Sequence, residues 1–115
     1  MTLAAILFAI AALGGIAMAI MRFQGKDLPP IGLALAHGLV AAAGLIALIV
    51  FVTGSKAPVQ TTIALAGFII AALGGFLLFS FHMRKKALPI PLVAIHGLVA
   101  VASFVILILA IWSRA

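Results

Sequence analysis

Two histidines are the side chains of this sequence best placed to do chemistry. His37 and His96 each lie inside a long apolar run, and each is followed by the same residues, Gly-Leu-Val-Ala. A neutral imidazole can bind a metal ion, accept a proton or donate a hydrogen bond near neutral pH. An ionisable side chain inside a membrane-length apolar run is a candidate functional residue, because its burial there is costly. The two histidines are therefore the first candidates for a functional site.

A second phrase also occurs twice. Ala-Ala-Leu-Gly-Gly stands at residues 11–15 and again at 71–75, an offset of 60, whereas the two histidine phrases are 59 apart. The chain therefore reads as one membrane domain, residues 1–115, made of a duplicated two-helix unit. The first repeat covers about residues 1–56 and the second about 57–115. The change of offset implies that one residue is lost early in the fourth helix.

The composition points to lipid as the solvent of this chain. Of its 115 residues 68% are hydrophobic and only 7% are charged, more apolar surface than a soluble domain of this size could bury. Four apolar runs have about the length needed to span a bilayer as a helix, at 3–21, 28–52, 59–81 and 88–112. Helix is favoured because backbone groups in lipid must be satisfied within the segment. The sequence predicts an all-α integral-membrane four-helix bundle of two tandem parallel helical hairpins.

The net charge of +6 is distributed as in a membrane protein and does not indicate nucleic-acid binding. Only Lys56 and Arg114 lie beside the second connection and the C-terminus. The other basic residues lie in or next to the first and third connections: Arg22, Lys26, Arg84, Lys85 and Lys86. The positive-inside rule then predicts cytoplasmic first and third connections, with both termini outside, in the bacterial inner membrane. Asp27, the only acid, is expected to cap the second helix, and His82 is expected at the interface.

The two histidines are expected at the same depth. His37 lies seven residues after Pro30, and His96 lies seven after Pro89. At 1.5 Å per residue, both are about 10 Å inside the membrane boundary. The same level of the first and third helices holds two glycine pairs: Gly14, Gly15, Gly74 and Gly75. The bundle is thus expected to combine two imidazoles with unusually thin walls at one level.

This level has the features that a b-type haem needs. Short connections make neighbouring helices antiparallel, so that the second and fourth helices lie on a diagonal of roughly 12–14 Å. That diagonal accommodates His37 and His96 as the two axial ligands of haem iron, with the macrocycle between them. The porphyrin edges would face the glycine pairs, and Gly38 and Gly97, which directly follow the histidines, are counted among the haem-binding residues. The propionates would reach basic residues of the cytoplasmic side, Arg22 or Arg84 among them.

Through the His37-Gly38 and His96-Gly97 phrases and the paired glycines, the chain resembles transmembrane b-type cytochromes that hold haem between histidines of a four-helix bundle. The resemblance implies an electron-transfer protein rather than a stand-alone enzyme, exchanging electrons with a quinol or a redox partner protein. Cytochromes of the b561 type are similar, but they carry two haems and need four histidines. This chain offers two, which implies a single haem b.

Other functions compete with this one. The histidines could form only structural hydrogen bonds, bind a chlorophyll-type ligand, relay protons or face another copy in an oligomer, and the small residues could serve only helix packing. The chain would then be an accessory subunit of a larger membrane complex. A small transporter is a further alternative, since four helices in this length resemble the small multidrug-resistance exporters. Those depend on a membrane-embedded glutamate, and this sequence has none.

Overall fold

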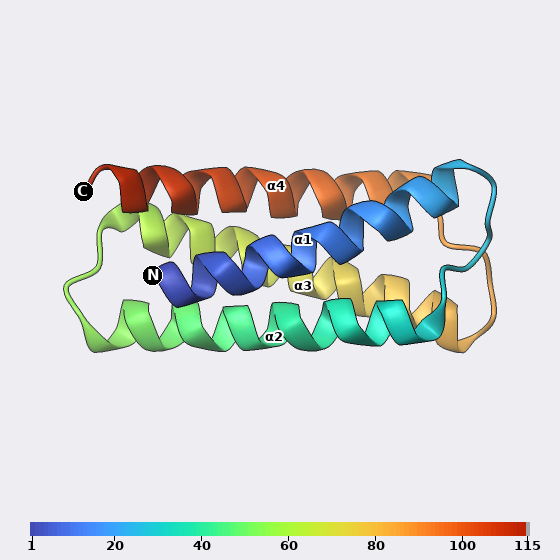
Figure 1. The fold of residues 1–115 in the computed structure, drawn as a ribbon, viewed down its shortest axis with the longest axis horizontal. Helices are drawn as coiled ribbons and strands as arrows, with labels where there is room; N and C mark the ends of the chain where they lie inside the picture. Colours follow the sequence, from blue (N-terminus) through green and yellow to red (C-terminus); the bar gives the residue numbers. More distant parts are fainter. Residues whose placement is uncertain (115) are drawn as a thin grey trace.

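The computed structural model describes residues 1–114, which fold into an elongated bundle of four α-helices with no strand (Figure 1). The helices are α1 (Thr2–Phe23), α2 (Ile31–Gly54), α3 (Val59–Met83) and α4 (Ile90–Trp112). Each is long and apolar enough to cross a membrane, and the bundle measures 43 × 20 × 19 Å. The structure therefore confirms the predicted all-α four-helix bundle and is consistent with an integral membrane protein.

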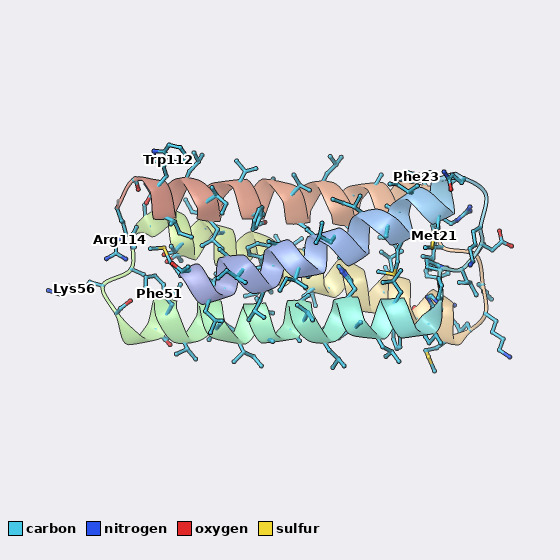
Figure 2. All side chains as sticks on the ribbon, viewed as in Figure 1. Met21, Phe23, Phe51, Lys56, Trp112 and Arg114 are labelled. Carbon is cyan, nitrogen blue, oxygen red and sulfur yellow. The ribbon has the colours of Figure 1, made fainter. Side chains whose placement is uncertain are left out.

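Each helix packs against its neighbours in sequence, and α1 also packs against α4, which completes the four-helix bundle. The helices α1 and α3 lie on one diagonal, and α2 and α4 lie on the other, as expected from the short connections. The α1–α2 and α3–α4 connections share one end of the bundle (Figure 1). We call this the basic end, because it carries Lys26, Arg84, Lys85 and Lys86. Lys56, Trp112 and Arg114 lie at the opposite end, with both termini (Figure 2).

Prolines set the first residues of three helices. Pro30, Pro58 and Pro89 precede α2, α3 and α4 with extended ψ angles of 134°, 149° and 122°. A helix loses nothing at this position by the missing N–H of proline, because the first N–H groups of a helix lack partners in any case. As a result α2 begins at Ile31 and α4 at Ile90, two or three residues later than the apolar runs predict.

These helix starts correct the prediction of a residue lost within the fourth helix. Counted from Ile31 and from Ile90, His37 and His96 are each the seventh residue of their helix. The helices are therefore in register, and the missing residue belongs to the connection before α4. The predicted capping role of Asp27 is also wrong, because α2 has Pro30 at its N-cap and no side-chain hydrogen bond there.

Helices α1 and α3 end in the same way, with a Schellman motif. The N–H groups of Lys26 and Lys86 donate to carbonyl oxygens five residues earlier, at 3.0 and 2.9 Å. The motif requires a left-handed residue just after the helix, where glycine is favoured because it has no Cβ. Gly25 fills this position after α1 with a φ of 100°. Lys85 fills this position after α3 with a φ of 54°, a backbone conformation that residues other than glycine rarely adopt.

The two hairpins are joined at the basic end through one buried residue. The backbone N–H of Leu88 donates to the carbonyl oxygen of Asp27 at 3.1 Å. The carbonyl oxygen of Leu88 in turn accepts a hydrogen bond from Nε of Arg22 at 2.7 Å. The Leu88 side chain is buried against Leu78 and Val93. The two connections of the basic end are therefore held together by one backbone hydrogen bond, by the Arg22 side chain and by packing.

The apolar core consists of two separate clusters rather than one. The larger fills the half of the bundle near the termini, and it comprises Ala4, Ala5, Phe8, Leu48, Ala64, Phe68 and Leu107. Its centre is a parallel stack of Phe8 on Phe68, with ring centroids 3.7 Å apart and planes 4° apart. The smaller cluster closes the basic end and consists of Leu78, Leu88 and Val93. Domains of this size usually have one contiguous core, so the level between the clusters needs a separate explanation.

The two hairpins place a glycine at the same helix crossing, but on opposite helices. In the first hairpin Gly44 of α2 lies against α1, where an added Cβ would come within 3.3 Å of the Leu7 Cβ. In the second hairpin the glycine is on the other helix, since Gly67 of α3 lies against Ser103 of α4. Leu7 corresponds to Gly67 at the offset of 60, and Gly44 corresponds to Ser103 at the offset of 59. Each hairpin therefore has one glycine at this crossing, on α2 in the first hairpin and on α3 in the second.

The two Schellman motifs make opposite predictions for equivalent positions. We expect Gly25→Ala to lower the free energy of unfolding by about 1 kcal/mol, because a Cβ is disfavoured at positive φ. We expect Lys85→Gly to leave it unchanged or to raise it, since relief of the strained φ offsets the added chain entropy of glycine. Thermal unfolding in detergent measures both. A loss of stability in Lys85→Gly as large as that in Gly25→Ala would contradict the assignment.

Candidate functional site

The two histidines meet on the long axis of the bundle, between the two core clusters. His37 comes from α2 and His96 from α4, which are diagonal helices, yet the imidazole centroids are only 6.3 Å apart. The ring planes are almost perpendicular, at 80°. Both side chains are half-buried. The structure thus brings together the two residues that the sequence singled out, and it places them where the apolar core is interrupted.

A backbone carbonyl group of the neighbouring helix fixes each imidazole. Nδ1 of His37 lies 2.7 Å from the carbonyl oxygen of Ala11 on α1. Nδ1 of His96 lies 2.8 Å from the carbonyl oxygen of Ala71 on α3. A carbonyl oxygen can only accept, so Nδ1 must carry the proton and donate it. Each neutral ring therefore keeps its lone pair on Nε2, which is the arrangement found in metal-ligating histidines whose other nitrogen donates to a carbonyl group.

The glycine pairs of α1 and α3 make room for these rings. A Cβ added to Gly15 would lie 2.9 Å from Cε1 of His37, and one added to Gly75 would lie 3.2 Å from Cε1 of His96. A Cβ added to Gly14 would lie 3.6 Å from the Cβ of His37, and one added to Gly74 would lie 3.5 Å from Nδ1 of His96. We expected these glycines at the edges of a porphyrin, whereas the structure places each pair against the imidazole of its own hairpin. Their absent side chains let Nδ1 reach the carbonyl oxygen.

The glycines that follow the histidines lie apart from the imidazole pair. A Cβ on Gly38 or on Gly97 would meet nothing within 4 Å. Gly38 is exposed on the surface of α2. Gly97 lines an apolar groove of about 330 Å³ between α1 and α4, which also contains Gly15 and Val93. The structure therefore leaves open space at both glycines, and Gly97 shares its groove with Gly15 of the site.

The basic residues expected near propionates lie at the basic end with partners of their own. Arg22 is occupied through Nε by the Leu88 carbonyl oxygen. The Arg84 guanidinium lies 4.6 Å from the centroid of the Phe81 ring, and its Nε lies 3.3 Å from the carbonyl oxygen of Ser80. The structure does not bring either arginine into contact with the imidazole pair. Their predicted role as propionate partners stays a prediction.

The donor set fits a haem iron better than a bare metal ion. Within residues 1–114 no three side chains of the metal-ligating types, His, Cys, Asp and Glu, come together. A protein-bound zinc ion takes three or four protein ligands, whereas haem iron takes axial ligands because the macrocycle supplies the others. A metal about 2 Å from a nitrogen of each ring would place the ring centroids about 6 Å apart. The separation between His37 and His96 is 6.3 Å.

The carbonyl acceptors were missed by the sequence analysis, although the sequence contains a signal for them. Ala11 and Ala71 open the repeated Ala-Ala-Leu-Gly-Gly phrase, four residues before Gly15 and Gly75. Residues four apart are neighbours on one helix face, so a ring that lies on the glycine is within reach of that alanine. The Phe8–Phe68 stack was also missed.

Comparisons of the chain with protein-family models, with curated proteins and with solved structures find no match. The fold alone does not imply a function, because helical bundles host many. Any functional conclusion must therefore come from the geometry of the imidazole pair and its surroundings.

The two kinds of glycine at this level predict different effects of alanine substitution. Gly15→Ala should push the His37 ring away from Ala11, because the new Cβ would be too close to Cε1, and we expect a loss of about 1–3 kcal/mol in stability. Gly38→Ala is the matched control in α2. It has open space and should be neutral or stabilising by up to about 1 kcal/mol, because alanine favours helix over glycine. Thermal unfolding followed by circular dichroism separates the two, and equal effects would contradict the packing described above.

Proposed function

We propose that this protein is a small membrane b-type cytochrome that holds one haem between His37 and His96 and transfers electrons. One observation carries the proposal. The imidazoles of His37 and His96 lie with their centroids 6.3 Å apart, each with Nδ1 bound to a backbone carbonyl oxygen, in a level that interrupts the apolar core. When bound, haem would supply reversible one-electron redox chemistry, which no side chain of this chain offers.

The residues of the chain would prepare the two ligands for this role. The carbonyl groups of Ala11 and Ala71 fix the tautomer and the orientation of each ring. Gly15 and Gly75 allow these contacts because a side chain at either position would crowd the ring. If both His37 and His96 hold the haem, a small molecule would find no free coordination position. The arrangement therefore favours electron transfer over oxygen chemistry.

The position of the pair along the bundle favours electron exchange at the basic end. As the seventh residue of α2 and of α4, each histidine lies about 10 Å inside the start of its helix. The larger core cluster, with the Phe8–Phe68 stack, fills the bundle on the other side. A quinol or a redox partner protein would therefore exchange electrons near the basic end. By the positive-inside rule this end would be cytoplasmic in a bacterial inner membrane, with both termini outside.

The second candidate function is an accessory subunit of a larger membrane complex. The observation that favours it is the pair of hydrogen bonds from His37 to Ala11 and from His96 to Ala71. Each bond already links the two helices of a hairpin, which is a sufficient structural role for a membrane histidine without any cofactor. The two proposals differ in whether Nε2 has a ligand.

Visible spectra of the purified protein separate the two functions. We expect a sharp reduced α-band of the b type in the wild-type protein after dithionite reduction, and its loss in His37→Ala and in His96→Ala. His82→Ala is the matched control. His82 lies in the last turn of α3, and it should leave the band unchanged. A wild-type protein that stays colourless after haem is supplied would exclude the cytochrome and support the accessory subunit.

A further inference from the structure

The basic end carries more positive charge than the connections need for packing. Lys26, Arg84, Lys85 and Lys86 are all exposed, and they belong to two connections that the Leu88 hydrogen bonds hold together. At the opposite end the exposed cations are Lys56 and Arg114 (Figure 2). Charge anywhere in the first and third connections would satisfy the positive-inside rule. The positions of these side chains are more specific than that rule requires.

Lys85 carries a charged side chain at a position where the backbone conformation favours glycine. It adopts the left-handed conformation after α3, and the corresponding residue after α1 is Gly25. The Schellman motif forms equally well with glycine, as the end of α1 shows. A residue held in a disfavoured conformation points to a local function when the fold does not need it there. What Lys85 adds over glycine is an exposed ammonium group between two other cations.

The Arg84 side chain determines where along α3 an anion would meet this surface. Its side chain runs back along α3, with the guanidinium over the Phe81 ring at 4.6 Å. The guanidinium also donates to Ser80, from Nε to the carbonyl oxygen at 3.3 Å and from an Nη to Oγ at 3.4 Å. Ser80 lies four residues before Arg84, about 6 Å closer to the membrane centre along the helix. The charge is therefore held back along α3, beside its last apolar turn.

We infer that Arg84, Lys85 and Lys86, together with Lys26, form a binding surface for the phosphate group of an anionic phospholipid. Arginine and lysine form strong charge-assisted hydrogen bonds with phosphate oxygens. Basic clusters next to a membrane helix attract anionic lipids, and the attraction grows with each cation. An acidic protein would fit exposed lysines as well, but the depth of the Arg84 guanidinium favours a lipid. This inference does not depend on the haem.

Native mass spectrometry of the purified protein in neutral detergent tests the inference. The protein is titrated with a phosphatidylglycerol and with a phosphatidylcholine of the same acyl chains, and soluble glycerol phosphate is added as a competitor. We expect tighter binding of phosphatidylglycerol, and a loss of about tenfold or more in its affinity in Arg84→Gln/Lys85→Gln/Lys86→Gln. The matched control is Lys56→Gln/Arg114→Gln, which removes charge at the opposite end and should retain the preference.

A second variant separates binding from folding. Lys85→Gly removes one cation and relieves the left-handed backbone, so it should bind phosphatidylglycerol more weakly while its unfolding temperature does not fall. Equal affinity for the two lipids, or full affinity in the triple variant, would overturn the inference and leave an acidic protein as the ligand of this end. If soluble glycerol phosphate displaced phosphatidylglycerol at an equal concentration, the inference would also be overturned. The surface would then bind free phosphate rather than a lipid.

Discussion

The hydrogen bond from each histidine Nδ1 to a carbonyl oxygen of the adjacent helix is the constraint on which the site depends. It joins α2 to α1 through Ala11, and α4 to α3 through Ala71, at 2.7 and 2.8 Å. It also fixes the tautomer and the rotation of each ring, which in lipid could not be left to water. A carbonyl oxygen has two lone pairs, so it can accept this bond in addition to its helical one. Gly15 and Gly75 are needed because a Cβ at either position would crowd the ring.

Duplication of the hairpin explains why the site contains two imidazoles. His37 and His96 occupy corresponding positions, as do Phe8 and Phe68, and both pairs meet at the centre of the bundle. Corresponding residues of two copies meet where the axis that relates the copies passes, so this axis runs along the bundle, as in parallel membrane repeats. A side chain that points inward from one hairpin thus meets its counterpart. The exchange of the small residue between Gly44 and Gly67 shows that the copies can diverge while this arrangement is kept.

The sequence was sufficient for the fold because lipid restricts the choices. Apolar length and backbone satisfaction specify helices, and short connections specify antiparallel neighbours, hence the diagonal of His37 and His96. Depth along a helix also follows from residue counting. The directions in which the side chains point do not follow from residue counting. For this reason the glycine pairs were expected at the edges of a porphyrin rather than against the imidazoles. The contact of Arg22 with Leu88 is equally invisible in the sequence, because it depends on how the two connections meet.

The most direct test of the imidazole pair as a ligand pair is the electron paramagnetic resonance spectrum of the oxidised wild-type protein, with the haem content measured on the same sample. We expect about one haem per chain and a low-spin ferric signal, because the proposed ligation by two imidazoles, whose centroids lie 6.3 Å apart, would complete the coordination of one iron. A high-spin signal would mean that only one imidazole, or neither, binds the iron. That result, or a protein without haem, would contradict the central role given to the pair.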